Sequence, residues 1–273
     1  MADRCAIIAG SGTFPLHVAR EARRQGLTVI GIGLAGWVDP ALASQVDAYE
    51  EVAIGQLGRL IDGLKRHQAR QAIMAGKVTK EILFDSRARF DAESLAILAR
   101  AKGVSVNALL GAIGDRLAQE GITLLDSSTF LQECLCPVGL LSRRAPTAQE
   151  QEDIRIGMQA ARQLASLDIG QTVVVKNRVV VAVEALEGTD ATISRAGQLA
   201  GGDLVVVKMA SPTQDRRFDL PILGQQTMAV AASSGVRCLA VEARATLLLD
   251  KPALLAQADA AGLCLIGLEP PVG

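Results

Sequence analysis

The stretch CAIIAGSGTFPLHVAREARRQGLTVIGI, residues 5–32, determines the fold expected for the start of this chain. Residues 5–9 form a short apolar run that predicts a buried strand, and residues 10–15 predict a turn because two glycines precede a proline. A helix is then expected to about Gln25, followed by a second apolar strand at residues 28–32. Strand, helix and strand in this order predict a parallel βαβ unit with a right-handed crossover.

The same alternation continues through the first 135 residues. Further strands are expected at residues 49–52, 72–75 and 122–125, and further helices at 57–64, 92–101 and 106–120. We therefore predict an N-terminal domain at residues 1–135 with a Rossmann-like parallel sheet. Residues 136–146 break the pattern, because two prolines, a glycine and an arginine pair lack any periodicity. This segment is expected to be a linker.

The remaining residues, 147–273, predict a second α/β domain. Thr147 and Glu150 have the spacing of a capping box, so a helix is expected from there to about Ala165. Strands at 172–176 and 179–184, joined by Asn177 and Arg178, predict a hairpin. The alternation then resumes with helices at 191–199, 225–233 and 251–261 and strands at 204–207, 238–241 and 263–267.

Composition narrows the classes of function. The 273 residues are 49% hydrophobic but only 3% aromatic, which predicts a core of alanine, leucine, valine and isoleucine. A net charge of −1 gives no general attraction to nucleic acid, so no nucleic-acid partner is expected. The start of the chain lacks a signal-peptide pattern, and no stretch of about 18 uncharged apolar residues predicts a spanning helix. We expect a cytoplasmic protein.

The five cysteines predict reduced thiols rather than disulfides or a metal site. Their number is odd and CxxC spacing is absent. Cys5, Cys238 and Cys264 lie in apolar runs and are expected to be buried. His17 and His67 lie in expected helices without the spacing of metal ligands, so neither zinc binding nor catalysis is expected of them.

Residues 208–224, KMASPTQDRRFDLPILG, are the most highly charged connection between an expected strand and an expected helix. This connection contains Lys208, Asp215, Arg216, Arg217 and Asp219. A connection this polar usually lies on the surface or lines a site. Cations beside carboxylates suit a site that holds a phosphorylated substrate and cuts a phosphoryl bond. Ion pairing between the aspartates and the neighbouring arginines is the alternative.

A second acidic turn, EGTD at residues 187–190, also follows an expected strand. Glu187 and Asp190 supply hard oxygen ligands of the kind that Mg²⁺ prefers. Thr189 or Asp190 is expected to cap the next helix. Two such loops in one region of an α/β chain predict that both open onto a shared mouth.

Two turns of the N-terminal domain are candidates for phosphate contact. The turn at Gly10, Ser11 and Gly12 precedes a helix, where glycines let the backbone approach an anion. It is neither the dinucleotide fingerprint, since Pro15 occupies the third glycine position, nor a P-loop. An ordinary tight turn is the alternative. Gly76 and Lys77 follow another parallel strand, at the edge where ligands bind in open sheets, and a solvated lysine is the alternative there.

Five segments in matching order resemble the LpxI family, whose members are UDP-2,3-diacylglucosamine pyrophosphatases of lipid A biosynthesis. The resemblance covers nearly the whole chain. The segments are IIAGSGTFP at 7–15, AGKV at 75–78, LDIGQTVVV at 167–175, VEALEGTD at 183–190 and KMASPTQDRRFDLP at 208–221.

The resemblance implies a Mg²⁺-dependent hydrolase that cleaves the pyrophosphate of UDP-2,3-diacylglucosamine into UMP and 2,3-diacylglucosamine 1-phosphate. It also implies two domains with the substrate between them: the N-terminal domain binds substrate or nucleotide and the C-terminal domain is catalytic. A substrate with two acyl chains implies transient contact with the inner leaflet, and hence a peripheral location. Whether the protein forms a homodimer is left open.

The family's key acid falls in an Arg-x-Asp-Leu-Pro segment, which maps onto residues 217–221 and makes Asp219 the leading catalytic candidate. Lys208 and Arg217 are expected to neutralise phosphate charge, and Arg216 to be a solvated neighbour. The expected metal ligands are Asp219, Asp215, Glu187 and Asp190. The expected substrate contacts are Gly10, Ser11, Gly12, Gly76, Lys77, Gly188, Thr189 and Gln214.

Two other functions stay open. One is a nucleotide-dependent oxidoreductase that uses the first glycine turn, although the missing third glycine disfavours it. The other is a non-enzymatic module that binds a sugar nucleotide or a lipid. Release of UMP from UDP-2,3-diacylglucosamine, measured with Mg²⁺ or with EDTA, separates the three.

Overall fold

The computed structural model of this chain describes residues 3–78, 90–100, 106–211, 215–218 and 220–269. The chain divides into two compact units. Unit 1 comprises Met1–Leu131 together with Asp215–Asp219, and unit 2 comprises Gln132–Gln214 together with Leu220–Gly273. Each unit has its own sheet and its own buried core, and the expectation of a two-domain α/β chain is confirmed.

Unit 1 is built on a five-stranded parallel sheet in the order β3-β2-β1-β4-β5. The direction in which the chain adds strands reverses between β1 and β4, and in open α/β sheets this is the point where ligands bind. The strands are β1 (Arg4–Ala9), β2 (Thr28–Leu34), β3 (Ala48–Val52), β4 (Gln71–Ala75) and β5 (Thr123–Leu124).

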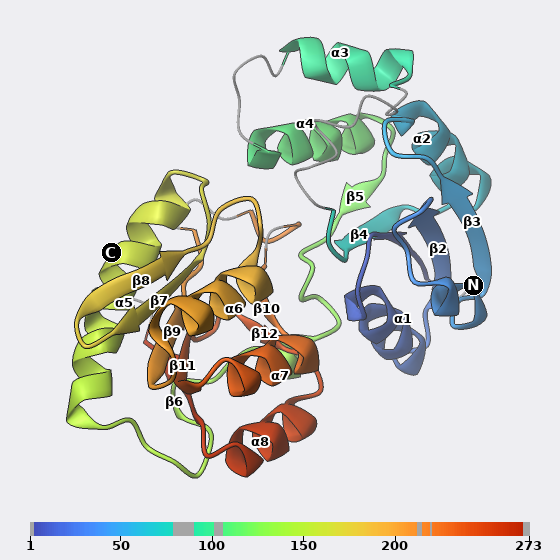
Figure 1. Ribbon diagram of the computed structural model, residues 1–273. Coiled ribbons are helices and arrows are strands. Elements are labelled where there is room, and N and C mark those ends of the chain that lie inside the picture. Colours follow the sequence, from blue (N-terminus) through green and yellow to red (C-terminus); the bar gives the residue numbers. More distant parts are fainter. Residues whose placement is uncertain (1–2, 79–89, 101–105, 212–214, 219, 270–273) are drawn as a thin grey trace. The chain divides into compact units, whose positions relative to one another are not determined.

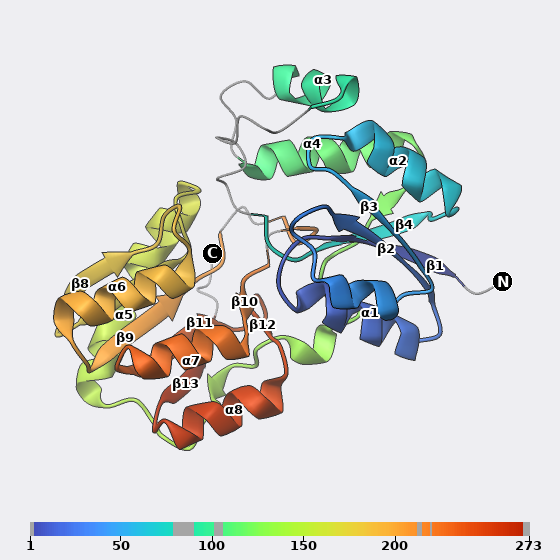
Figure 2. The same cartoon turned by 45° about the vertical axis from the view of Figure 1, so that its right-hand side comes forward.

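Helices cover both faces of this sheet (Figures 1 and 2). Helix α1 (Phe14–Arg24) and the 3-10 turn η1 (Pro40–Ser44) lie on one face, and α2 (Leu57–Arg66) and α4 (Val106–Gln119) lie on the other. Helix α3 (Ala92–Arg100) packs against α2 and α4. Alternate side chains of each strand therefore enter different halves of the core.

Unit 2 is built on a six-stranded mixed sheet in the order β6-β13-β11-β9-β7-β8. Strands β9, β11 and β13 are parallel, whereas β7 runs antiparallel to both of its neighbours and β6 runs antiparallel to β13. A separate pair, β10 with β12, is parallel. The strands are β6 (Gly139–Leu140), β7 (Thr172–Lys176), β8 (Val179–Val183), β9 (Leu204–Lys208), β10 (Ile222–Leu223), β11 (Val236–Glu242), β12 (Leu247–Leu248) and β13 (Cys264–Leu268).

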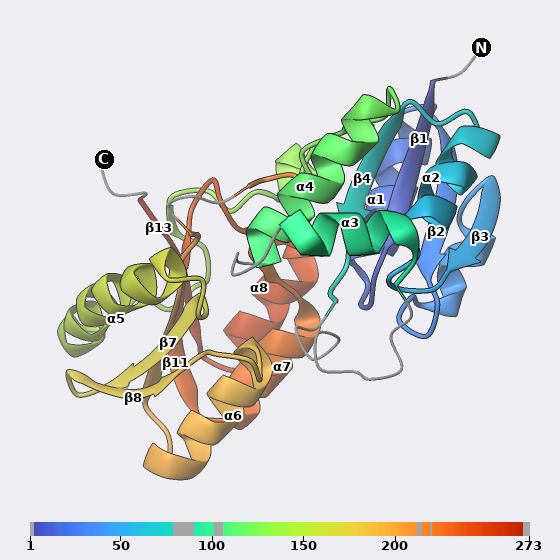
Figure 3. The same ribbon diagram turned by 90° about the horizontal axis from the view of Figure 1, so that it is seen from above.

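The six-stranded sheet separates helix α5 (Ala148–Ser166) from the other three helices of unit 2 (Figure 3). These three are α6 (Thr189–Ala200), α7 (Gln225–Ser233) and α8 (Lys251–Ala260). Valines of β7 and β9 alternate between the two faces, so Val174 and Val206 pack under α6 and α7 while Val175 and Val207 pack under α5. Among the described residues, no helix is long and apolar enough to cross a membrane.

Several local predictions are confirmed. Thr147 and Glu150 form the expected capping box, because the Thr147 side chain accepts from the Glu150 amide and the Glu150 side chain accepts from the Thr147 amide. The hairpin of β7 and β8 turns at Asn177 and Arg178, whose φ values of 50° and 66° give the twist that a two-residue hairpin turn needs. The three cysteines expected to be buried, Cys5, Cys238 and Cys264, are buried and reduced. Burial raises the pKa of the Cys5 thiol to about 12.

Some elements were not expected. The two-residue strands β6, β10 and β12 are too short to show any periodicity in sequence. Strand β6 lies within residues 136–146, which were expected to be a linker, and it adds an edge strand to the sheet of unit 2. Nearby, the amide of Cys136 donates to the carbonyl of Thr246, and the Cys136 side chain is buried in the core.

Candidate functional site

The two glycine turns of unit 1 lie together at the carboxyl ends of β1 and β4. The amide of Gly10 donates to the carbonyl of Ala75 (2.8 Å). Ser11 and Lys77 exchange backbone hydrogen bonds of 2.9 Å in both directions, and Ser11 Oγ donates to the Lys77 carbonyl (2.8 Å). The structure thus joins four of the predicted substrate contacts, Gly10, Ser11, Gly76 and Lys77, at the position where the strand order reverses.

The close approach of these turns explains two of the glycines. A Cβ at Gly10 would lie 2.8 Å from the carbonyl oxygen of Lys77. Gly76 has a φ of +94°, and a Cβ there would lie 2.7 Å from the carbonyl carbon of Gly10. Gly12 is different: its φ is +90°, and a Cβ at this position would meet nothing within 4 Å. The space beside Gly12 is therefore open, whereas Gly10 and Gly76 allow the two turns to pack closely.

A segment from much later in the sequence, residues 215–218, belongs to unit 1. The amide of Ser127 donates to the carbonyl of Arg216 (2.9 Å), and Ser127 Oγ lies 2.7 Å from the carbonyl oxygen of Arg217 and 3.0 Å from that of Met74. Ser127 follows β5 and Met74 lies in β4, so this one serine connects the segment to the same edge of the sheet as the glycine turns.

Arg216 was expected to be only a solvated neighbour, and that expectation is wrong, because its side chain binds two other residues. Its Nε donates to Oδ2 of Asp126 (2.6 Å), and its Nη2 donates to Oγ of Ser128 (3.1 Å). Burial by itself would raise the pKa of Asp126, but the hydrogen bonds from Ser128 and Arg216 outweigh it and the pKa is lowered. Asp126 and Arg216 are 90 positions apart, so no local pattern in the sequence could indicate the pair.

Asp215 and Arg217 form the ion pair that was the alternative to metal binding. Arg217 Nε lies 2.9 and 3.0 Å from the two carboxylate oxygens, and Nη2 lies 2.6 Å from Oδ2. The Asp215 carboxylate also accepts from the Arg217 amide (3.0 Å). The side-chain hydrogen bond from Arg217 is the main reason why the pKa of Asp215 is lowered.

In unit 2, Lys208 is the last residue of β9 and its side chain is only 10% exposed, although an exposed loop was one expectation. Its Nζ donates to Oγ1 of Thr189 (2.9 Å) and of Thr172 (3.4 Å). The carboxylate of Glu184 lies 3.9 Å away. Lys208 is therefore held at the carboxyl end of β9 by groups from β7, α6 and the end of β8.

Glu184 completes this network, and sequence reasoning missed it. Its Oε1 accepts from Thr189 Oγ1 (3.0 Å), and its Oε2 accepts from the amide of Gln171 (3.2 Å). Burial by itself would raise the pKa of Glu184, but Lys208, the hydroxyls of Thr172 and Thr189 and the Gln171 amide lower it. The available signal was a carboxylate directly after the apolar strand at 179–183.

The turn at residues 187–190 does not cap α6 as expected. The N-cap is Gly188, with a φ of 81° and no side-chain cap. The Thr189 side chain is used by Lys208 and Glu184, and Asp190 Oδ1 accepts from Thr227 Oγ1 (2.7 Å), which connects α6 to α7. Glu187 is exposed and pairs with Arg195 (2.7 Å).

The described carboxylates do not fit a preassembled magnesium site. Glu187 is bound by Arg195, Asp190 by Thr227 and Asp215 by Arg217. Within the part of the chain that the structure describes, no group of three or more His, Cys, Asp or Glu residues could hold a metal ion. Asp219, the leading candidate, and Gln214 lie outside the described residues.

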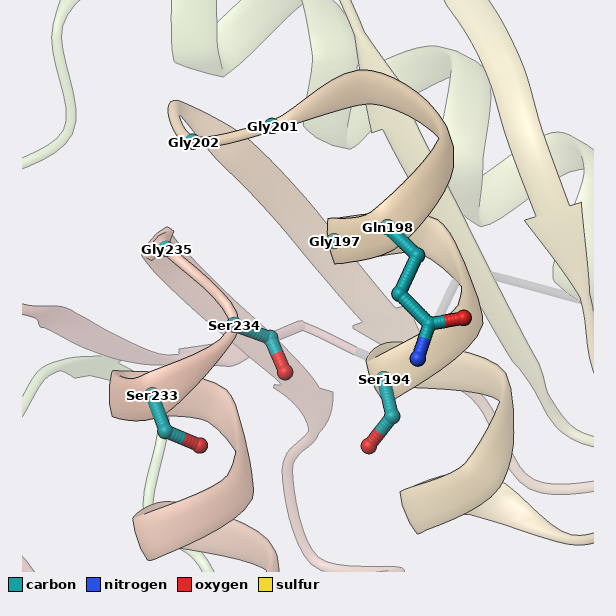
Figure 4. A pocket seen from close by; sticks show the side chains of 8 residues that line it. All are labelled: Ser194, Gly197, Gln198, Gly201, Gly202, Ser233, Ser234 and Gly235. Carbon is teal, nitrogen blue, oxygen red and sulfur yellow. The ribbon is translucent and has the colours of Figure 1, made fainter.

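A shallow groove of about 440 Å³ lies elsewhere in unit 2, where the carboxyl ends of α6 and α7 come together (Figure 4). The residues that line it are uncharged, and most of them are small: Ser194, Gly197, Gln198, Gly201, Gly202, Ser233, Ser234 and Gly235. None of the predicted site residues is among them.

Comparison with known proteins identifies the family. Residues 4–134 match the LpxI N-terminal domain, and residues 137–266 match the LpxI C-terminal domain. The UDP-2,3-diacylglucosamine pyrophosphatase LpxI of Caulobacter vibrioides is 32% identical over 276 aligned residues, which cover 97% of each chain. The chain belongs to the LpxI family. The resemblance predicted from the five motifs is confirmed.

Solved structures show only a weak likeness to this LpxI-family chain. A biotin carboxylase domain of a thermophilic 2-oxoglutarate carboxylase, bound to ADP, has a TM-score of 0.29 and 11% identity, and covers 64% of this chain and 35% of that one. The biotin carboxylase subunit of a pyruvate carboxylase has a TM-score of 0.26 and 14% identity, and covers 76% of this chain and 44% of that one. Scores this low do not establish a common fold.

The network in unit 2 adds two residues of the LpxI motifs to the candidate site. Glu184 lies in the VEALEGTD segment and Thr172 in the LDIGQTVVV segment, and the structure brings both to Lys208 of the third. Three segments that are separate in the sequence of this LpxI-family protein thus meet at one edge of the sheet in unit 2.

Proposed function

We propose that this protein hydrolyses the pyrophosphate bond of UDP-2,3-diacylglucosamine, releasing UMP and 2,3-diacylglucosamine 1-phosphate for lipid A biosynthesis. The observation that carries the proposal is the match to both LpxI domains in order, together with the alignment over 97% of the chain to the Caulobacter vibrioides relative, which is a UDP-2,3-diacylglucosamine pyrophosphatase. The alignment spans the domain expected to bind substrate as well as the domain expected to cleave it.

Pyrophosphate hydrolysis develops negative charge on the transferred and leaving oxygens, so fixed cations near the bond lower the barrier. Lys208 in unit 2 and Arg217 in unit 1 are cations held by short contacts to neighbouring side chains, which supports their proposed role in neutralising phosphate charge. Asp219 is proposed as the catalytic carboxylate that holds Mg²⁺ or orients the attacking water, because its position matches the family's Arg-x-Asp-Leu-Pro segment.

Magnesium dependence is part of the proposal and is supported by the family resemblance. Bound Mg²⁺ would supply Lewis-acid stabilisation of phosphate oxygens. Because the described carboxylates already have protein donors, we assign the role of ligand first to Asp219, and to Glu187, Asp190 and Asp215 only if they exchange those donors.

The nucleotide end of the substrate is proposed to bind at the paired glycine turns of unit 1, where Gly12 has open space beside it. The exposed Lys77 on the adjoining turn adds a cation there. The two acyl chains imply transient contact with the inner leaflet from the cytoplasmic side, as a peripheral protein.

The decisive experiment is UMP release from UDP-2,3-diacylglucosamine in detergent micelles, with Mg²⁺ and with EDTA. The expected result is release that requires Mg²⁺ and falls by about 10²-fold or more in Asp219→Asn, as for loss of one preorganised electrostatic group. Binding without UMP release would identify a binding module instead. Wild-type turnover in Asp219→Asn would refute the catalytic assignment of Asp219.

A further inference from the structure

The guanidinium of Arg217 lies against helix α4 at a residue that has no side chain. A Cβ built on Gly114 would lie 2.9 Å from Arg217 Nη1 and 3.4 Å from Arg217 Cζ. Gly114 is buried and lies within α4, where glycine is a poor helix former and therefore calls for a packing reason. The Arg217 side chain occupies the space that any other residue at 114 would fill.

Three further contacts fix Arg217 in this place. Asp215 binds Nε and Nη2, which leaves Nη1 on the edge toward Gly114. Ser127 holds the backbone carbonyl of Arg217 at 2.7 Å. The Phe218 ring lies 5.8 Å from Cζ, which is within the range of a cation–π contact. Three parts of Arg217 are thus held by different residues. Ser127 binds its backbone carbonyl, Asp215 binds one edge of the guanidinium, and the Phe218 ring contacts the guanidinium.

The arrangement leaves part of the guanidinium available to a ligand. The Arg217 side chain is 34% exposed, and among the described residues no hydrogen-bond acceptor is found for its Nη1. An arginine that is oriented by a carboxylate and still offers N–H donors suits a phosphate oxyanion, because its donors are directed before the ligand arrives.

We propose that Gly114, Ser127 and Asp215 are positioning residues that orient Arg217 toward a phosphate oxyanion of the substrate. This inference rests on the proposed function, since the phosphate is that of the sugar nucleotide. Asp215 then acts as the partner of Arg217 and not as a metal ligand. The set of three residues, together with Arg217, is called the arginine seat below.

Helix α4 provides a matched pair of variants. Gly111 lies one turn before Gly114 in the same helix, and nothing lies within 4 Å of a Cβ built there. Alanine at either position improves helix propensity, so Gly111→Ala is expected to raise Tm by about 2–4 °C and to leave kcat unchanged. Gly114→Ala is expected to keep Tm within a few degrees of wild type.

Displacement of the guanidinium in Gly114→Ala is expected to lower kcat for UMP release by up to about 10²-fold, since misplacement of about 1 Å can cost that much. A loss of activity without a loss of Tm separates positioning from folding. Equal kcat in the two alanine variants would overturn the arginine seat.

A second measurement does not depend on the reaction. Phenylglyoxal labelling of Arg217, followed by peptide mass spectrometry, is expected to be several-fold faster in Gly114→Ala than in Gly111→Ala, because the displaced guanidinium leaves Asp215. Equal labelling rates contradict the seat even if the protein proves inactive. A wild-type protein that releases no UMP contradicts the proposed function alone.

Asp215→Asn separates the seat from a metal site. If Asp215 only orients Arg217, the variant is expected to have a lower kcat. The Mg²⁺ concentration that gives half-maximal activity is expected to stay unchanged. A marked rise in that Mg²⁺ concentration would show that Asp215 binds the metal, and would remove it from the seat.

Discussion

At the scale of single residues, Lys208 and Glu184 show how a buried charge is tolerated in unit 2. Their side chains are only 10% and 12% exposed, and an isolated charge at such a position would be costly. Each is instead bonded to Thr189, and Glu184 also accepts from the Gln171 amide. These hydrogen bonds offset the cost of burying the two side chains at the edge of the sheet.

The lowered pKa of Glu184 gives a stability prediction with a defined sign. A carboxylate whose pKa in the folded protein lies below its ordinary value of 4.5 stabilises the fold above that value, and the contribution is lost as the pH falls through the folded pKa. Glu184→Gln is expected to lower the unfolding free energy by about 1–3 kcal/mol at pH 7. The difference from wild type is expected to shrink below pH 4.5.

Urea unfolding of the two proteins across pH 3–8 measures this difference directly. Glu187→Gln is the control: Glu187 is exposed and its partner Arg195 is nearly half exposed, so solvent screens that pair and little change is expected. A destabilisation by Glu184→Gln that is constant over the whole range would show that the ionised carboxylate does not contribute through Lys208.

At the scale of elements, the paired glycine turns after β1 and β4 depend on close backbone contact. Gly10→Ala would place a Cβ 2.8 Å from the Lys77 carbonyl oxygen, and backbone on both sides limits how far either turn can shift. We expect a loss of about 1–3 kcal/mol in unfolding free energy, as for other overpacked sites. Urea unfolding checks this, and a variant as stable as wild type would mean that the turns can separate freely.

Helix α2 of unit 1 shows where prediction from the sequence succeeds. Helix α2 was predicted from the spacing of Leu57, Leu60, Ile61 and Leu64, and all four side chains are buried against the sheet. Such predictions hold because burial imposes a period of its own on the sequence. The parallel pairing of β1 with β2 was likewise expected from the order strand, helix, strand.

Sequence reasoning fails where a side chain has two local uses or a distant partner. Thr189 and Asp190 have the composition of helix caps, but Lys208 and Thr227 bind their side chains instead. Arg216 resembles any charged loop residue until Asp126 is brought next to it by the fold. The candidate loops could thus be proposed from the sequence, whereas the hydrogen-bond partners of their side chains could not.

At the scale of the whole molecule, unit 1 is formed by two separate stretches of the chain. The chain leaves unit 1 after Leu131, forms β6 to β9 of unit 2, and returns to unit 1 with Asp215–Asp219 before it completes unit 2. Residues 215–218, which include the first two positions of the Arg-x-Asp-Leu-Pro segment, therefore belong to a different compact unit from strands β9 and β10 on either side of them. A linker at 136–146 alone does not describe how the two units are joined along the chain.

Phe218 tests this arrangement, because its side chain packs against the core of unit 1 formed by residues such as Leu117 and Leu124. Phe218→Ala is expected to destabilise unit 1 by less than the ~3–5 kcal/mol typical of a fully buried phenylalanine, since Phe218 is only partly buried. Hydrogen exchange should therefore accelerate in β4, β5 and α4, which are distant in sequence, and remain unchanged in β9 and α7, which flank the segment.

Met228→Ala is the matched control, because Met228 is fully buried in the core of unit 2. Its effect should appear in α7, β9 and β11, with β4 and β5 unaffected. The opposite result for Phe218→Ala, faster exchange in β9 and α7 with β5 unchanged, would place residues 215–218 with their neighbours in sequence. That result would also contradict the arginine seat, since Gly114 and Ser127 could not hold Arg217 in a segment that belongs to unit 2.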